Sequence, residues 1–526
     1  MTSHIRRRSL LRGGAWTAAA LAASPALLAA CGNDTEPSAT GPSGPPKAGG
    51  TLRAAFVGAG ASETLSYFHG GTNLDFVRAR AMHATLGNLD PSAPDGVRYE
   101  VLDGIDVSPD LTSYTLRIRP GLTFSDGSPL TARDVLYSLI TPFQDAKSLA
   151  VYKTPGRNFD LAKAEVKDPL TLILPTLRPI ADGRLVLCQG NYLVLKEGSR
   201  FEQAAPTSGP FRLTTFEAGQ GAALVRNDAF TLHEVLLDGL ELRNIADSDA
   251  RAAALTGGQI DFAGDLAPIT ARNLDGSGTV TVTRSEAPYV SGLFFRLNMT
   301  QKPFDDPRVR TAFKLAANRQ AMLDTALHGQ GLIGNDLLSP GFPGYAEDIA
   351  QRPYDPEAAR ALLAEAGAQN LEVTLTTGPE TPGMVEVATL YVENLTQIGV
   401  KATLRELPAG QLFADFPAYV KLPFAASFSV PVPPMPLYQS SYGGKNPSAL
   451  GWNRPDVDAE VTKARAAADP AAAATAAATA QRAMWTDGNT VAPVFKPFIT
   501  AAVPGVRGVA DDLFAQFPGF SRASLR

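Results

Sequence analysis

The stretch "YTLRIRPGLTFSDGSPLTARDVLYSL", residues 114–139, carries the clearest folding signals in the sequence. Its first six residues alternate apolar and polar side chains, which predicts a strand over 114–119. Pro120-Gly121 and Asp126-Gly127 then predict turns. Thr131, with Asp134 three residues further on, has the pattern of a helix N-terminus, so a helix is predicted to begin at residue 132. A strand, a turn and a helix therefore follow one another directly in this stretch.

Similar signals continue on both sides of this stretch. Strands and helices alternate in the second half of the chain, which favours an α/β lobe. An alanine-rich stretch at 465–484 predicts a surface helix with strong intrinsic propensity. The other predicted elements are strands over 51–57, 289–299, 371–377 and 401–407, a hairpin over 207–230, and helical segments over 247–258, 305–329, 355–367 and 384–400.

The N-terminal segment has the layout of an export signal followed by a lipid-attachment site. Arginines precede an uncharged apolar run from Ala15 to Ala30, which is short for a membrane span. Residues 7–12, "RRSLLR", resemble a twin-arginine signal, and "LAAC" at 28–31 resembles a bacterial lipobox. We therefore expect a signal peptide over 1–30 and a diacylglycerol group on the Cys31 thiol. A flexible tether rich in Gly, Pro and Ser is expected over 31–50.

The length and charge of the chain limit its class. A chain of 526 residues exceeds one ordinary core, so two or three domains are expected. The formal net charge is −5, and four arginines precede residue 31, so the remainder is near −9. This charge argues against nucleic acid or an anionic membrane surface as a partner. The composition, 44% hydrophobic and 19% charged, is typical of a soluble globular protein.

The common catalytic and metal-binding motifs are absent from the sequence. The five histidines have no metal-ligand spacing, and HExxH, the P-loop, GxSxG and CxxC do not occur. Gly58-Ala59-Gly60 begins like a dinucleotide fingerprint, but Glu63 stands where the third glycine would fall. Cys188 is expected to be a buried structural thiol. We therefore expect no catalytic residue, no metal and no cofactor.

Several segments, taken in order, resemble the extracellular solute-binding proteins of the peptide/nickel class of ABC importers, family 5. The resemblance covers nearly everything from Thr51 to about Phe520, and each motif is weak alone while the ordered set is specific. Besides 114–139, the matching segments are "TSGPFRL" (207–213), "DARAAALTGGQIDFA" (249–263), "KPFDDPRVRTAFKLAANRQAML" (302–323), "YDPEAARALLAEAG" (354–367), "LTQIGVKATLREL" (395–407), "GWNRPDVDAEVTKA" (451–464) and "APVFKPF" (492–498).

The resemblance implies a two-lobed α/β fold of the periplasmic-binding-protein type (type II, cluster C), with an extra domain inserted in the first lobe. The first lobe would comprise 51–87, 207–288 and 495–526, the inserted domain 88–206, and the second lobe 289–494. Solute would bind between lobes that close around it, and no bond would be made or broken. The expected partners are a peptide or other small solute, the permease subunits of an ABC importer and, through the lipid, the outer face of the cell membrane. We expect a monomer that binds no nucleic acid.

The resemblance also argues against a dipeptide as the solute of this chain. Dipeptide-binding members hold the ligand's amino group with an Asp near a "GW-x-x-D-Y-x-D-P" stretch. Here "SFSVPVPPM" (427–435) places Phe428 at the Trp position and Pro431 at the Asp position. Those members also carry an Arg before the helix that corresponds to 384–400, and "TTGPETPG" (376–383) has none. A buried zwitterion would lack both partners, so an apolar or weakly polar solute fits better.

The candidate solute contacts are aromatic or acidic side chains at positions that face the cleft in this family. Phe428 takes the position of a cleft Trp, and Tyr438 lies just beyond it. Tyr289 opens a second-lobe strand near a crossover between lobes, while Glu63 and Tyr67 follow the first strand. Core or surface packing is the alternative for Tyr289 and Tyr438. Two other functions stay open on the same fold: an exported sensor or chaperone, and an exported enzyme.

Overall fold

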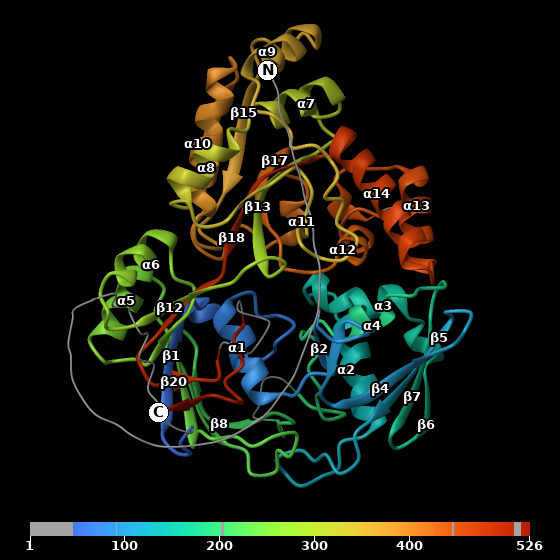
Figure 1. Cartoon of the computed structure of the whole chain (residues 1–526), viewed down its shortest axis with the longest axis vertical. Coiled ribbons are helices and arrows are strands. Elements are labelled where there is room, and N and C mark those ends of the chain that lie inside the picture. The colour runs from blue at the N-terminus through green and yellow to red at the C-terminus, as the bar shows by residue number, and fades with distance from the viewer. Residues whose placement is uncertain (1–45, 91, 201–204, 444–445, 510–516, 526) are drawn as a thin grey trace, which may run out of the picture. The chain divides into compact units, whose positions relative to one another are not determined.

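The computed structural model describes residues 46–526 except 91, 201–204, 444–445, 510–516 and 526. The predicted signal peptide and Cys31 lie outside the described residues, as does most of the predicted tether. Three larger β-sheets organise the described part of the chain, each with helices packed against it (Figure 1). Contacts join the described residues into one unit.

The first sheet has seven strands and gathers segments that are far apart in the sequence. Its central strand β1 (Thr51–Phe56) runs parallel to both of its neighbours, β10 (Gly239–Asn244) and β11 (Phe262–Ala263). Helix α1 (Asn73–Met82) packs on one face, and α5 (Ser248–Thr256) with α6 (Pro268–Asp275) on the other. We call the part built on this sheet the first lobe. Its other strands are β8 (Phe211–Glu217), β9 (Gly221–Arg226), β12 (Thr281–Arg284) and β19 (Ile499–Ala502).

The second sheet has six strands, and we call the part built on it the second lobe. Its order is β14-β18-β13-β17-β15-β16, and its largest apolar cluster packs against α7, α8, α9 and α10. The strands are β13 (Val290–Leu297), β14 (Leu332–Ile333), β15 (Glu372–Thr377), β16 (Lys401–Glu406), β17 (Phe424–Phe428) and β18 (Thr490–Pro497). The helices are α7 (Pro307–Leu315), α8 (Arg319–Ala326), α9 (Pro356–Glu365) and α10 (Met384–Gln397).

The third sheet contains the stretch 114–139 and has the order β4-β5-β7-β6. The predicted strand is β5 (Ser113–Ile118), and the predicted helix is α2 (Ala132–Gln144). The backbone N–H and the hydroxyl of Thr131 both donate to the Asp134 carboxylate at 2.8 Å, which confirms the predicted helix N-terminus. The remaining strands are β4 (Leu102–Val107), β6 (Glu165–Asp168) and β7 (Thr171–Pro175).

The elements outside these sheets are short apart from two helices of the second lobe. Strands β2 (Gly87–Leu89) and β3 (Val97–Tyr99) pair, as do β20 (Val506–Arg507) and β21 (Ser524–Leu525). The helices are α3 (Thr154–Asn158), α4 (Gly183–Leu187), α11 (Phe416–Tyr419), α12 (Pro434–Ser441), α13 (Pro455–Ala466) and α14 (Pro470–Asp487). The 3-10 turns are η1 (Gly60–Ser62), η2 (Ala150–Lys153), η3 (Leu161–Lys163) and η4 (Pro447–Ala449).

The prediction for the alanine-rich stretch is wrong at its start. The chain breaks between α13 and α14, because the Asp469 carboxylate caps the backbone N–H groups of Ala471 and Ala472 and begins a new helix at Pro470. One face of α14 is buried rather than solvated, since α13 and α14 pack against each other in one apolar cluster. The buried residues of α14 are Ala476, Ala477, Ala480 and Gln481.

The domain boundaries drawn from the resemblance stay predictions. The seven-stranded sheet takes its strands from 51–56, 211–284 and 499–502, the four-stranded sheet from 102–175, and the six-stranded sheet from 290–497. We therefore propose an inserted domain around the four-stranded sheet, with boundaries near those drawn from the sequence.

The second lobe buries a lysine against the end of a helix. Lys314 of α7 is 1% exposed, and its ammonium donates to the carbonyl oxygen of Trp485 in α14 at 3.0 Å. Burial lowers the pKa of this amine from 10.5 to about 7. Below pH 7 the folded and unfolded chains both bind the proton, so the cost of burying the charge is fully present. Between pH 7 and 10.5 the unfolded chain binds more protons, so stability rises with pH.

Replacing Lys314 by Met should remove this dependence of stability on pH. The wild-type free energy of unfolding should rise relative to that of Lys314→Met by up to about 1.4 kcal/mol per pH unit between pH 7 and 10. Urea unfolding of both proteins at pH 6, 7, 8 and 9 measures the difference. Lys421→Met, at an exposed position, is the control and should show the wild-type slope. A Lys314→Met slope equal to that of the wild type would contradict the assignment.

Candidate functional site

The two lobes are joined by two crossovers of the chain that lie side by side. One crossover, residues 285–289, leads from β12 to β13, and the other, Phe498, leads from β18 to β19. The Ser285 N–H donates to the Phe498 carbonyl at 3.0 Å, and the Phe498 N–H donates to the Ser285 hydroxyl at 2.8 Å. Strand pairing continues on both sides, with β12 against β19 and β13 against β18. A two-stranded ribbon therefore runs from one sheet into the other.

A lysine lies on this ribbon at the second-lobe side. Lys496 of β18 stands opposite Ser291 of β13 and is 5% exposed. Its ammonium lies 5.1 Å from the centre of the Phe498 ring. Burial lowers the pKa of this amine to about 8, while Asp265 of the first lobe acts in the opposite direction. The amine therefore stays mainly protonated at neutral pH and is attracted to a carboxylate across the lobe boundary.

The first lobe presents polar groups where its parallel strands end. The Val57 N–H, directly after β1, donates to the Asp265 carboxylate at 3.1 Å, and the Asn73 amide donates to the other oxygen. The Gly58 N–H donates to the side chain of Asn244, the last residue of β10, at 3.0 Å. In open α/β sheets ligands bind outside the carboxyl ends of the strands. Asp265 and Asn244 therefore lie at the edge of the first lobe where a ligand is expected.

Glu63 belongs to a buried ionic network at the same edge. Its carboxylate accepts from the Asn244 amide at 2.8 Å and from the Arg78 guanidinium at 3.4 Å. Burial raises the pKa of Glu63, against the attraction of Arg78. A side chain at Gly58 would stand 2.3 Å from a Glu63 carboxylate oxygen, so only glycine fits there. Both carboxylate oxygens of Glu63 thus already have partners in the protein.

Tyr67 lies in an aromatic cluster further from the ribbon. Its side chain is 2% exposed and meets Phe68 and Tyr152 edge to face, at 5.3 and 4.9 Å between ring centres. Its hydroxyl oxygen is buried and has no hydrogen-bond partner in the described part of the chain. Tyr67 therefore packs against the segment that we predict to be inserted.

Phe428 ends β17 on the same face of the second-lobe sheet as Lys496. Phe428 and Val494 both stand opposite Leu293, and Lys496 lies two residues beyond Val494 on that face. The ring is half-buried and meets Phe413 edge to face at 5.7 Å. Gly383, at the start of α10, also lies over Leu293. An aromatic side chain therefore lies on the same face of the sheet as the lysine.

The two remaining candidate tyrosines lie apart from each other. Tyr289, at the end of its crossover, is half-buried and packs edge to face on Phe342 at 6.2 Å. Tyr438 of α12 is 1% exposed, and its hydroxyl accepts from the Trp452 indole N–H at 2.7 Å. The structure thus places Tyr289 on a crossover of the ribbon and Phe428 at the end of β17, which pairs with the ribbon strand β13. Tyr438 lies in the helical cluster of α12–α14. The predictions of solute contact stay predictions.

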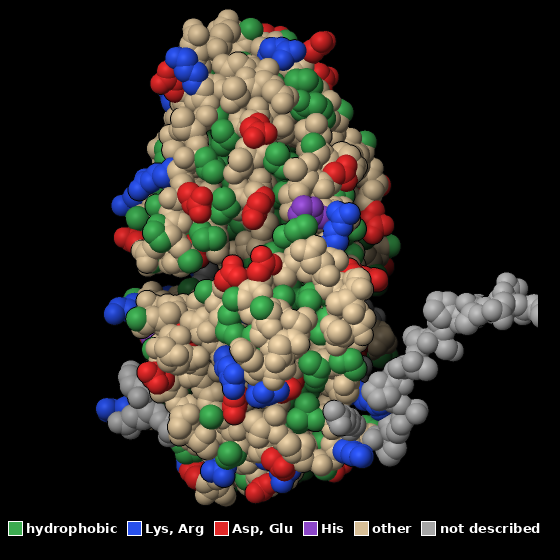
Figure 2. Space-filling model, turned by 90° about the vertical axis from the view of Figure 1, so that its left-hand side faces the viewer, with side chains coloured by type: hydrophobic (Ala, Val, Ile, Leu, Met, Phe, Trp, Pro, Cys, Tyr) green, Lys and Arg blue, Asp and Glu red, His purple; other side chains and the backbone are tan. Residues whose placement is uncertain are grey.

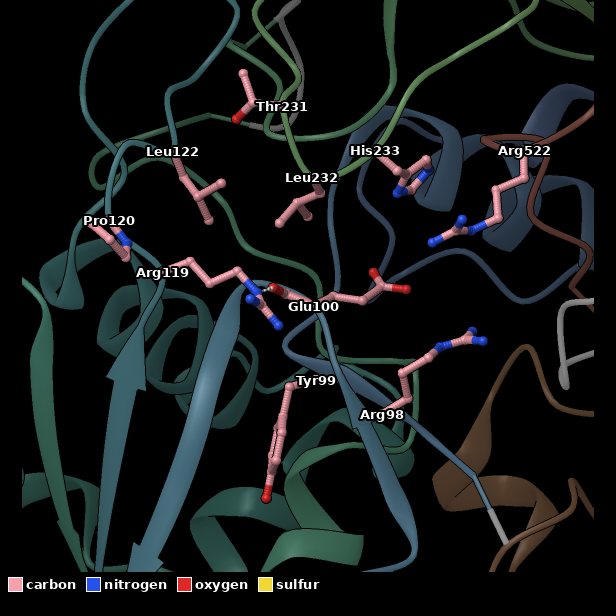
Figure 3. A pocket seen from close by; sticks show the side chains of 10 residues that line it. All are labelled: Arg98, Tyr99, Glu100, Arg119, Pro120, Leu122, Thr231, Leu232, His233 and Arg522. Atoms are coloured by element: carbon pink, nitrogen blue, oxygen red, sulfur yellow. Dashed lines mark hydrogen bonds between the residues drawn. The ribbon is translucent and has the colours of Figure 1, made fainter. Parts of the chain in front are cut away.

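A separate hollow of about 370 Å³ carries basic side chains (Figure 3). Burial, together with Arg522 and Arg98, lowers the pKa of His233 there to about 4. The Arg119 guanidinium donates to the carbonyl oxygen of Glu100 at 2.7 Å. None of the sequence-predicted contacts lines this hollow. Its lining residues are Arg98, Tyr99, Glu100, Arg119, Pro120, Leu122, Thr231, Leu232, His233 and Arg522.

A second contact of the second lobe lies away from the ribbon and joins it to the proposed inserted domain. Arg465 of α13 is 3% exposed and binds the Asp182 carboxylate through two nitrogens, at 2.7 and 2.6 Å. A third nitrogen donates to the Asn158 side-chain oxygen at 2.7 Å. Figure 2 shows a notch at the left edge of the molecule, about halfway along its long axis. The arginine therefore links the second lobe to α3 and to the start of α4 in the proposed inserted domain.

Comparisons with known proteins define the class. The family model described as "Bacterial extracellular solute-binding proteins, family 5 Middle" matches residues 96–447. The chain belongs to this family. A curated relative, the glutathione-binding protein GsiB of Salmonella paratyphi A, is 28% identical over 363 residues, which cover 67% of this chain and 69% of the relative.

Solved structures share the two-lobed fold. The binding protein AgaA of A. tumefacien R10, in complex with agropinic acid, superposes with a TM-score of 0.79 at 22% identity, covering 91% of this chain and 99% of that one. The periplasmic binding protein DppA of Helicobacter pylori, with the peptide STSA, gives 0.77 at 19% identity, covering 91% and 98%. The predicted two-lobed periplasmic-binding-protein fold is thus confirmed. No helix among the described residues is long and apolar enough to cross a membrane.

Replacing Arg465 by Met should favour an open arrangement of the lobes. The substitution leaves Asp182 without its buried partner, and breaking such a pair costs about 3–5 kcal/mol. Because the pair joins two parts that can separate, we expect the lobes to move apart and expose Asp182 to water. Small-angle scattering of the protein without solute should give a larger radius of gyration than for the wild type.

The matched control is Arg482→Met, which breaks an exposed pair with Asp348 within the second lobe. It should leave the radius unchanged. An unchanged radius for Arg465→Met, with a lowered melting temperature, would show that the pair only stabilises the fold.

Proposed function

We propose that this protein captures a peptide or another small solute between its lobes and delivers it to the permease of an ABC importer. The observation that carries the proposal is the ribbon at Ser285 and Phe498, because two adjacent crossovers form a hinge about which two lobes can close. The family supports it, since its members are solute-binding proteins. The relatives and neighbours include a glutathione-binding protein and binding proteins solved with agropinic acid and with a peptide.

The protein would bind its solute without changing it. Among the described residues, no group of three or more His, Cys, Asp or Glu side chains could hold a metal ion. The acids at the lobe boundary have partners within the protein, because Glu63 is bound by Arg78 and Asn244, and Asp265 accepts from the backbone of Val57. We therefore propose a binding protein that acts as a monomer, without cofactor or catalytic residue.

Phe428 and Tyr289 are the aromatic contacts that we propose for the solute. Both are half-buried, and they lie on strand ends or crossovers next to the hinge. Aromatic side chains offer a large apolar contact area with few rotatable bonds. Glu63, Tyr67 and Tyr438, with close partners inside the protein, would support the walls of the site from behind.

Solute capture should be visible as bound mass and as closure. The full-length protein, purified in detergent without denaturant from cells grown in rich medium, should carry a small molecule detectable by native mass spectrometry. Returning that molecule to protein that has been unfolded and refolded should reduce its radius of gyration, because closure removes water from between the lobes. Retention of no small molecule, together with no change of radius on adding the small-molecule fraction of yeast extract, would contradict the function.

We further propose that Cys31 carries a lipid that holds the protein at the outer face of the membrane after twin-arginine export. Cells grown with labelled palmitate should transfer label to the wild type and not to Cys31→Ala. Cys188→Ala is the control, since Cys188 is a free thiol buried within the folded part. It should keep the label in full. Label on Cys31→Ala would exclude Cys31 as the attachment site.

A further inference from the structure

Lys496 is the exception among the buried basic side chains of the described residues. Each of the other buried arginines and lysines donates at least one hydrogen bond to a carbonyl or carboxylate oxygen, whereas no hydrogen bond or ion pair joins the Lys496 ammonium to a described residue. A buried charge without a partner is costly, so it needs an explanation. The residues that donate at least one such bond are Arg78, Arg251, Arg296, Arg310, Lys314, Arg319, Arg352 and Arg465.

The Lys496 side chain is largely covered, with 5% of the residue exposed. Every residue of β18 is buried, and the strand has β13 on one side and β14 on the other. The Phe498 ring offers a cation–π contact at 5.1 Å, which replaces only part of the lost hydration. Asp265 attracts the amine from the first lobe but forms no ion pair with it. The ammonium therefore retains unused donors at the boundary between the lobes.

We propose that Lys496 binds a carboxylate of the solute, so that the protein takes carboxylate-bearing solutes. The inference rests on the proposed function and names the solute class for that same site. A carboxylate can accept charge-assisted hydrogen bonds from the ammonium and neutralise it. Asp265, on the opposite lobe, would repel the carboxylate from its own side and attract an amino or hydroxyl donor of the same molecule. Phe428, on the Lys496 face of the sheet, leaves an apolar surface for the rest of the solute.

This proposal reverses the expectation of an uncharged solute. That expectation rested on two positions where dipeptide binders hold their ligand, Pro431 and the segment 376–383, and neither carries the required charge. In the second of these, Glu380 accepts from the backbone N–H groups of Gly410 and Leu412, so it supports a loop of the second lobe. Lys496 of β18 supplies the positive charge instead.

The test uses one mixture in two chemical forms. The full-length wild type in detergent is unfolded, refolded and incubated with the small-molecule fraction of yeast extract. A second sample receives the same fraction after its carboxylic acids have been converted to methyl esters. After washing, the protein is denatured and mass spectrometry identifies the retained compounds. We expect a carboxylate-bearing compound from the first fraction and its loss, at least tenfold, from the second.

The variant arm uses Lys496→Met, with Arg98→Met in the basic hollow as the matched control. Calorimetric titration with the retained compound should show at least tenfold weaker binding for Lys496→Met and unchanged binding for Arg98→Met. The melting temperature of Lys496→Met should equal or exceed that of the wild type, since an unpaired buried charge is removed. If that variant does not fold, the esterified fraction still tests the proposal on the wild type alone.

The outcomes separate this inference from the function on which it rests. A retained compound without a carboxylate, or equal retention from the esterified fraction, overturns the role of Lys496 and leaves the binding function intact. Unchanged affinity of Lys496→Met for an acid overturns it as well. Retention of nothing from either fraction contradicts the binding function itself and this inference with it.

Discussion

The hydrogen bonds between Ser285 and Phe498 tie the two chain crossovers into one ribbon. Because β12 pairs with β19 on one side and β13 with β18 on the other, the two lobes share a continuous ladder with a break only at the crossovers. Lobes connected in this way can rotate about the ribbon but cannot slide along it without losing backbone hydrogen bonds. Any group on the ribbon therefore keeps its position while the rest of each lobe swings.

Charge placement at the ribbon differs from charge placement elsewhere in the folded part. Within the second lobe, Asp336 binds both Arg319 and Arg352, at 2.8 and 2.6 Å, so that each buried guanidinium contacts the same buried carboxylate. The Lys496 ammonium instead forms no ion pair with a described residue, and the Asp265 carboxylate of the first lobe, which acts on it through its charge, already accepts from Val57 and Asn73. The unused donors of the ammonium are consistent with a place for a ligand group.

Local signals in the sequence predicted the elements well. Thr131 and Asp134 define the start of α2, and Pro307 the start of α7, because these residue types act through neighbouring backbone. The same rules could not show that α13 ends at Ala466, since alanine favours helix on both sides of the break and only Asp469-Pro470 marks it. The sheet order was beyond local rules altogether, because β1 pairs with strands about 190 to 210 residues away. The arrangement in two lobes was predicted from the family resemblance alone.

The site was predicted less completely for a different physical reason. A resemblance indicates which positions of a chain correspond to site positions in the family, and it led to Phe428 and Glu63 as candidates. It could not show that Arg78 and Asn244 bind the Glu63 carboxylate. Lys496 had a sequence signal of its own, a single charge within the apolar run "TVAPVFKP". Where the face of a strand is open to solvent, such a lysine extends into water and its charge has no consequence. In β18 every residue is buried, so the same side chain is largely covered. Whether a lysine in such a run is covered depends on what packs on that face of the sheet, which local sequence does not encode.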